Sequence, residues 1–157
     1  MDALRRIGGV ELPPIDQVGY VVKSLDETVA RYRHVFGPFT LLDSPLTGVL
    51  YRGKPTDVNL RIGFGSTGNL EIEFIEVVSG ASPHQEFLDA GREGIHHIRY
   101  RVPDCDATIA ALAGEGFAPI WYHDMGFAKF AYLEHASHDS VLIELLEMAG
   151  EPGATFS

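Results

Sequence analysis

The sequence predicts an α+β fold in which two tandem βαβββ modules form a cupped mixed sheet. The first observation is an internal repeat, because residues 17–30 and 97–110 align without a gap. The second is that each copy begins with the two-residue period of a strand and continues at helical spacing. The third is that three strand-like apolar segments follow each copy. Identical residues in the repeat are Tyr20/Tyr100, Val22/Val102, Asp26/Asp106, Thr28/Thr108 and Ala30/Ala110.

The first copy gives a strand over residues 17–22, followed by a helix. Ser24 and Glu27 form a capping box that starts the helix, and Gly37-Pro38 stops it. Strands are expected after this helix at about residues 48–52, 58–64 and 70–78.

The second copy repeats this order, with a strand that opens at His97 and a helix capped by Asp104. Cys105 takes the place of Leu25 on the apolar stripe of the helix, so we expect it to be a small buried core residue. Strands are expected after this helix at about residues 118–122, 127–133 and 141–146.

These elements divide the chain into one domain with short ends. Ser82 as the cap, Pro83 in the first turn and Gly91 as the stop predict a short helix between the modules. The expected boundaries are an N-terminal arm at 1–14, a single domain at 15–147, module one at about 15–80, a linker helix at about 82–91, module two at about 94–147 and a tail at 148–157.

Composition limits the classes of partner. The formal net charge of −10 argues against a nucleic-acid surface, which would be basic. No apolar run reaches the ~18 residues that a bilayer span needs, and we expect no secretory signal because no apolar stretch follows Arg5 and Arg6. The single cysteine, Cys105, excludes an internal disulfide framework and favours a reducing, cytoplasmic compartment. We therefore expect a small-molecule substrate, without nucleic acid or membrane as partner.

Charged or polar residues interrupt the apolar pattern of four strands that should build a core. Gln17 and His97 open the equivalent first strands of the two modules, and Glu73 and Glu144 lie in the two last strands. Because the repeat relates them, these side chains can converge on a point between the modules. A lone carboxylate at position 144 would be costly unless it were paired or bound to a cation. The alternatives are a solvated strand face for Glu71 and Glu73, and a merely hydrogen-bonded amide for Gln17.

The donor set indicates one divalent metal ion. One imidazole nitrogen, two carboxylates and one amide oxygen suit Mg²⁺, Mn²⁺, Co²⁺, Ni²⁺ or Zn²⁺ better than a metal that prefers thiolates. His96 points to the opposite face of the strand from His97, so we expect it to be structural or exposed. The remaining histidines are expected mostly at the surface: His34, His84, His123, His135 and His138.

At these residues the sequence resembles the vicinal oxygen chelate superfamily, which includes glyoxalases, bleomycin resistance proteins and dioxygenases. The resemblance covers about residues 15–147, and it implies the two-module fold with metal positions at Gln17, Glu73, His97 and Glu144. The motifs that carry it lie at residues 15–22, 70–75, 94–98 and 141–145.

The segment 82–98 is similar to the methylmalonyl-CoA epimerase branch of this superfamily. Two departures stand against that branch. Gln17 occupies a position where epimerases usually have His, and the span 41–56 holds Asp43 as its acid where epimerases carry a glutamate base. The second base of an epimerase would therefore be missing or replaced.

The resemblance implies a divalent-metal-dependent isomerase or epimerase that acts through a metal-stabilised enolate on a small acyl or carbonyl compound, such as a CoA thioester. Glu144 is the expected base. The group that returns the proton is open between Glu73, the second catalytic carboxylate, and a residue of the Tyr122-His123 region. One alternative is a glyoxalase-like lyase acting on a glutathione hemithioacetal, because some glyoxalases I use a Gln, Glu, His, Glu set. Another is a metal-free binding or resistance protein.

Further expectations concern the pocket and the assembly. Members of this superfamily often cover exposed sheet edges by pairing modules across a homodimer, so we expect a homodimer. A CoA substrate would seek a basic rim, for which the candidates are Arg92, Arg99 and Arg101. The substrate pocket is expected to include Tyr51, Asn59, Arg61, Tyr122, His123 and Tyr132.

Overall fold

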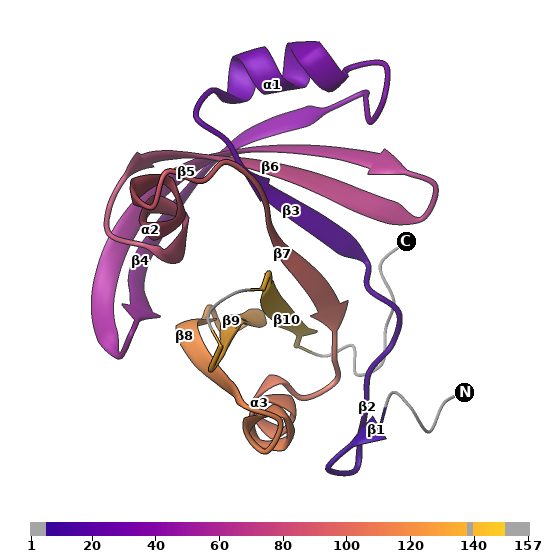
Figure 1. Ribbon diagram of the computed structural model, residues 1–157, viewed down its shortest axis with the longest axis vertical. Coiled ribbons are helices and arrows are strands. Elements are labelled where there is room, and N and C mark those ends of the chain that lie inside the picture. The colour runs from indigo at the N-terminus through magenta and orange to yellow at the C-terminus, as the bar shows by residue number, and fades with distance from the viewer. Residues whose placement is uncertain (1–5, 138–139, 150–157) are drawn as a thin grey trace.

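The computed structural model describes residues 6–137 and 140–149, in which an eight-stranded sheet closes into a barrel (Figure 1). The strand order around the barrel is β10-β7-β3-β6-β5-β4-β8-β9. The strands are β3 (Gln17–Val21), β4 (Thr40–Tyr51), β5 (Lys54–Thr67), β6 (Leu70–Ser79), β7 (Gly94–Arg101), β8 (Phe117–Asp124), β9 (Ala128–His135) and β10 (Leu142–Met148). The helices are α1 (Leu25–Tyr32), α2 (Pro83–Asp89) and α3 (Cys105–Ala113).

Two βαβββ modules build the barrel, which confirms the predicted α+β fold. The first contains β3, α1, β4, β5 and β6, and the second contains β7, α3, β8, β9 and β10, with α2 between them. In each module the first strand pairs parallel with the last, and the other pairs are antiparallel. The modules join along β3 and β7, and again where β4 meets β8. The first strands of the two modules therefore lie side by side (Figure 1).

The two longer helices begin at the capping side chains that the sequence predicts. Ser24 accepts a hydrogen bond from the backbone N–H of Glu27 at the start of α1, and Asp104 accepts one from Ala107 at the start of α3. Both helices lie outside the barrel (Figure 1). Cys105 is fully buried where α3 packs on the sheet, as expected for a small core residue.

The hydrophobic core has one inner part and two outer parts. The inner part fills the barrel and includes Trp121 and Tyr132. The outer parts lie under α1, around Phe74, and under α3, around Leu145. Alternation along each strand sends one set of side chains into the barrel and the other towards a helix. Polar side chains of the inner face therefore have apolar neighbours.

The hairpin of the first module is longer than the sequence pattern indicates. β4 begins at Thr40 and β5 ends at Thr67, well outside the expected spans 48–52 and 58–64. Most of β4 is exposed, so an alternation between buried and solvated residues does not mark its beginning.

Both ends of the chain differ in detail from the expected arm and tail. Within the arm, β1 (Arg6–Ile7) pairs with β2 (Val10–Glu11), and Ile7 packs on the core under α3. β10 extends through Met148, so the expected tail begins within this strand. Residues 1–5 of the arm and 150–157 of the tail lie outside the described residues. Across the described ranges, no helix has the length and apolar character needed to cross a membrane.

Candidate metal centre

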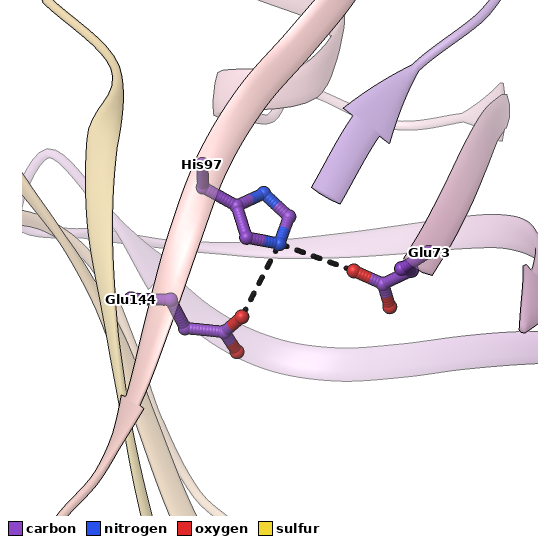
Figure 2. A group of neighbouring side chains, drawn as sticks. All are labelled: Glu73, His97 and Glu144. Carbon is purple, nitrogen blue, oxygen red and sulfur yellow. Dashed lines mark hydrogen bonds and ion pairs between the residues drawn. The ribbon is translucent and has the colours of Figure 1, made fainter. Parts of the chain in front are cut away.

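Four adjacent strands present the predicted metal ligands to one point inside the barrel. Glu144 lies on β10, His97 on β7, Gln17 on β3 and Glu73 on β6. Figure 2 shows the carboxylates of Glu73 and Glu144 reaching the same ring nitrogen of His97 from two different strands. The structure thus brings together the four side chains that the repeat relates.

The ring nitrogen Nε2 of His97 is the centre of this group. Side-chain oxygens surround it at 3.1 Å for Glu73, 3.2 Å for Gln17 and 3.3 Å for Glu144. Ligand atoms of Glu73, His97 and Glu144 all lie within 4.8 Å of one another. The His97 side chain is fully buried, and those of Glu73 and Glu144 are 10% and 12% exposed. The donors therefore form a compact set that is nearly closed to solvent.

Gly19 makes this approach possible. It pairs with His97 on one side and with Glu73 on the other, so it occupies the strand between them. A Cβ atom at position 19 would lie 2.1 Å from Nε2 of the His97 ring, far inside van der Waals contact. The ring therefore lies over the bare backbone of β3, which lets Nε2 reach the Glu73 carboxylate.

A carboxylate on the next strand orients the amide of Gln17. Nε2 of Gln17 donates a hydrogen bond to Oε1 of Glu71 at 2.7 Å. Because a carboxylate only accepts, the amide nitrogen faces Glu71 and the amide oxygen faces His97. Arg99 lies 3.5 Å from Glu71 and donates from Nε to Asp16 at 2.8 Å. Gln17 consequently presents an oxygen, the amide atom that binds metal ions, to the centre.

The tautomer of His97 is set by His96. Nδ1 atoms of the two rings lie 3.0 Å apart, and the His96 ring also hydrogen-bonds to the backbone of Pro83. Burial lowers the pKa of His96 well below its ordinary value, so this ring carries one proton. The His96 ring donates its one N–H to the carbonyl of Pro83. Nδ1 of His96 is therefore the acceptor for Nδ1–H of His97. Nε2 of His97 is thereby the nitrogen available to a metal ion.

Burial and the neighbouring negative charges shift the pKa of His97 in opposite directions. Burial lowers this pKa, but the hydrogen bonds and negative charges of Glu144 and Glu73 outweigh it and raise the pKa to about 9. Burial also raises the pKa of the Glu73 carboxyl, and the neighbouring His97 opposes that rise. The two carboxylates hence favour positive charge at the position where a cation would lie.

This donor chemistry fits a divalent metal ion. The imidazole offers a lone pair on Nε2 once it loses the proton there, the amide oxygen is turned inward, and two carboxylates supply the charge that a buried dication needs. Such a set suits the hard or borderline ions from Mg²⁺ to Zn²⁺. Gln17, Glu73, His97 and Glu144 are the residues that would hold the ion.

The centre opens on a cavity of about 180 Å³ inside the barrel. Glu73, Glu144, His84 and Tyr132 contribute polar groups to its wall, and most of the remaining lining is apolar. A small molecule bound here would meet the two carboxylates at one side and apolar side chains elsewhere, the usual character of a ligand pocket.

Among the residues expected to line the pocket, Tyr132 belongs to the cavity wall, whereas Asn59 and Arg61 do not. On β5 these two alternate with Val58 and Leu60, whose side chains fill the barrel, so they point outward. Arg61 there forms ion pairs with Asp26 and with a glutamate of β6.

Tyr51, Tyr122 and His123 also lie apart from the cavity wall. The hydroxyl of Tyr51 donates to a glutamate of α2, and that of Tyr122 donates to Asp106 of α3 at 2.9 Å. His123 packs edge-on against Phe130, which does line the cavity. Tyr51 likewise packs edge-on against Trp121, another residue of the cavity wall.

The three arginines expected at a basic rim do not line the cavity. Arg99 is buried and paired with Asp16 beside the metal centre. The guanidinium carbon of Arg92 lies 4.5 Å from the ring centroid of Phe87, next to α2. Arg101 ends β7. The charged tail of a substrate would therefore have to bind residues other than these arginines, or residues outside the cavity.

Two histidines beside the centre are buried: His84, which was expected at the surface, and His96, which was expected to be structural or exposed. His84 is 1% exposed and His96 is 3% exposed, so the surface expectation for His84 is wrong. α2 has seven residues and buries Pro83, His84 and Phe87. A helix of two turns is too short for its buried face to show as a period, although the spacing of His84 and Phe87 places them on one side.

Comparison with known proteins identifies the family of this chain. The family model described as Glyoxalase/Bleomycin resistance protein/Dioxygenase superfamily matches residues 16–132. The uncharacterized protein YqjC of Bacillus subtilis (strain 168) is 24% identical over 140 residues, which cover 87% of this chain and 94% of that protein.

Solved structures of similar fold include a hypothetical protein from Bacillus halodurans C-125, with 25% identity, a TM-score of 0.61, and coverage of 89% of this chain and 97% of that one. A variant of Streptomyces coelicolor methylmalonyl-CoA epimerase, in complex with 2-nitronate-propionyl-CoA, has 22% identity, a TM-score of 0.65, and coverage of 92% and 100%. The epimerase of Mycobacterium tuberculosis has 21% identity, a TM-score of 0.63, and coverage of 94% and 95%. Because the family model spans most of the sequence, the chain belongs to the glyoxalase/bleomycin resistance protein/dioxygenase superfamily.

Proposed function

We propose that the protein is a divalent-metal-dependent isomerase or epimerase, which acts through an enolate on a small acyl or carbonyl compound. A CoA thioester is the first substrate class to test. The observation that carries the proposal is the convergence of Glu73 and Glu144 on Nε2 of His97 at the wall of one cavity. Family membership supports it, as does the fold shared with a methylmalonyl-CoA epimerase solved in complex with methylmalonyl-CoA.

The proposed chemistry is proton transfer at a carbon next to a carbonyl. A bound ion would supply Lewis acidity that makes this carbon-bound proton easier to remove. Glu144 takes the proton as general base. Glu73 is the group proposed to relay a proton from solvent to the other face of the enolate, because it approaches from β6 while Glu144 approaches from β10 (Figure 2). Glu144 afterwards releases to solvent the proton that it removed. The mostly apolar lining of the cavity strengthens the electrostatic interactions of the substrate with these carboxylates.

The position of Asp43 supports Glu73 in this role. Asp43 is the acid of the span 41–56, and it is exposed on β4. Its neighbour Ser44 lines the cavity, as does Leu46 two residues further along β4. Since strand neighbours point to opposite faces, the Asp43 carboxylate faces away from the cavity. The second proton-transfer group is therefore sought among the carboxylates of the centre.

Solvent exchange tests the proposal. Candidate 2-substituted acyl-CoA esters are incubated in D₂O with metal-loaded protein, metal-stripped protein and the Glu144→Gln variant, and deuterium is measured by mass spectrometry. Metal-loaded wild type should incorporate deuterium, and the other two preparations should not. Glu115→Gln is the matched control, because this carboxylate is exposed after α3. If no panel member exchanges or is converted while one binds tightly to metal-free protein, a sequestration function replaces the proposal.

A glyoxalase-like lyase acting on a glutathione hemithioacetal is the second candidate. The inward-facing amide oxygen of Gln17 favours it, because it completes a Gln, Glu, His, Glu donor set. A lyase product can keep the original hydrogen when proton return is fast, so deuterium alone does not test this reaction. Direct measurement of the thioester product distinguishes the lyase from the epimerase.

A further inference from the structure

We propose that the hydroxyl of Tyr132 donates a hydrogen bond to a substrate oxygen, and that His84 leaves its proton available for this role. The inference deepens the proposed function and rests on it, because the oxygen concerned is the carbonyl oxygen that gains negative charge as the carbon-bound proton leaves. It assigns a protein group to the charged oxygen in addition to any ion.

Tyr132 lies on β9 with 4% of its surface exposed, and it lines the same cavity as Glu73 and Glu144. Its ring centroid is 4.8 Å from that of His97, at an interplanar angle of 31°. Trp121 stacks with it at 6.2 Å and 17°. These aromatic contacts fix the ring, so the position of the hydroxyl is also fixed.

The proton on His84 can be located from its surroundings. Burial lowers the pKa of His84 to about 3, so the ring is neutral and carries one proton. Nε2 lies 2.8 Å from the Tyr132 hydroxyl, whereas Nδ1 is buried with no hydrogen-bond partner among the described residues. Within the described part of the chain Nδ1 has no partner in either tautomer, but a proton on Nδ1 would be a buried donor without an acceptor, which proteins avoid. A proton on Nε2 instead leaves the unpaired hydrogen on the hydroxyl of Tyr132, a residue of the cavity wall. The proton therefore lies on Nε2, and Tyr132 accepts it.

An accepting hydroxyl keeps its own hydrogen for another partner. A phenol both donates and accepts, and the hydrogen bond to His84 uses the accepting side of Tyr132. A phenol loses its proton only at about pH 10 in water, so the hydroxyl is a donor at neutral pH. A fixed, protonated donor in an apolar cavity is the arrangement that stabilises a developing oxyanion. This hydrogen bond selects substrates whose carbonyl oxygen can accept from the Tyr132 hydroxyl while the adjacent carbon-bound proton lies near the carboxylates.

Tyr132→Phe tests the donor directly, because it removes the hydroxyl and keeps the ring. Metal content should be unchanged, while kcat for exchange should fall on the order of ten- to hundredfold with little change in KM. Tyr122→Phe is the matched control, since the Tyr122 hydroxyl is bonded to Asp106 outside the cavity, and its kcat should equal that of wild type. His84→Gln, whose amide N–H can replace the Nε2 donor, should retain more activity than His84→Leu.

Nitrogen NMR of histidine-labelled, metal-free protein gives a second readout that needs no substrate. His84, assigned through the His84→Gln spectrum, should show the neutral tautomer protonated at Nε2 between about pH 5 and pH 8. An Nδ1-protonated ring would overturn the inference, because Tyr132 would then donate to His84. If wild type exchanges and Tyr132→Phe matches it, the inference fails and the proposed function stands. If wild type exchanges no substrate of the panel, both fail, whatever the tautomer.

Discussion

The amide nitrogen of Gln17 lies 2.7 Å from the carboxylate of Glu71, and this contact turns the amide oxygen towards His97. Glu71 itself does not reach the His97 ring. It nevertheless decides which atom of Gln17 faces the centre, because a carboxylate cannot donate a hydrogen bond. A residue outside the ligand set thereby controls a member of it.

Replacing Glu71 should therefore weaken metal binding. Loss of an outer partner of a ligand typically costs about ten- to hundredfold in affinity, and we expect a loss in this range for Glu71→Ala. Competition with a chromophoric chelator measures it, with the exposed Glu115→Ala as the control. Equal affinities of the two variants would show that Gln17 does not depend on Glu71.

Metal content tests the ligands themselves. Purified wild-type protein should bind about one divalent ion per chain, since the donors form one compact group. His97→Ala and Glu144→Gln should each lose most of the ion, as measured by inductively coupled plasma mass spectrometry. Wild-type metal content in both variants would rule out the site.

Metal binding should release a proton. The pKa of His97 is raised to about 9 in the metal-free protein, so at pH 7 the ion has to displace the proton on this ring. Affinity should then rise with pH, by up to about tenfold per unit, and level off above pH 9. Calorimetry in buffers of different ionisation enthalpy counts the protons. A buffer-independent enthalpy at pH 7 would contradict this account.

Gly19→Ala should disrupt the centre through packing alone. The added Cβ would lie 2.1 Å from the His97 ring, and overpacking of this kind costs about 1–3 kcal/mol of unfolding free energy. Metal affinity should fall as well, because the ring has to move. Gly114→Ala is the control, since a Cβ there meets nothing closer than 3.8 Å. Denaturant unfolding of both variants should separate them clearly.

Self-association is predicted at the edge of β4. Among the described residues this strand pairs with β8 only at Leu50 and Tyr51, which leaves its first part without a partner on that side. Leu41 and Leu42 in that part are 47% and 40% exposed. Exposed edges are usually covered, so we expect a homodimer that Leu42→Lys weakens. Light scattering at micromolar concentration checks this, and a monomeric wild type would refute it.

The fold was predictable because the repeat constrains two periods at once. A strand period followed by a helical stripe recurs in register, and gapless agreement of both is rare by chance. The ligand set was accessible because charge inside an apolar strand is costly, which makes Glu144 conspicuous. The repeat can be recognised in the sequence alone, and the free-energy cost of an unpaired charge inside an apolar strand is large.

The cavity wall was less predictable because it depends on strand faces. Asn59 and Arg61 are polar residues of β5, but their alternation with Val58 and Leu60 places them on the face away from the cavity. His84 lies in a helix too short to reveal its buried face.

The boundary between β3 and β7 separates the ligands into two pairs, Gln17 and Glu73 from one module and His97 and Glu144 from the other. Neither half of the duplicated chain holds a complete set, so an ion would act as a cross-link between halves. An ion present at a thousandfold its dissociation constant adds about 4 kcal/mol to the stability of the bound state. That energy would act on the junction of the modules, where amide hydrogen exchange along β3 and β7 would slow first.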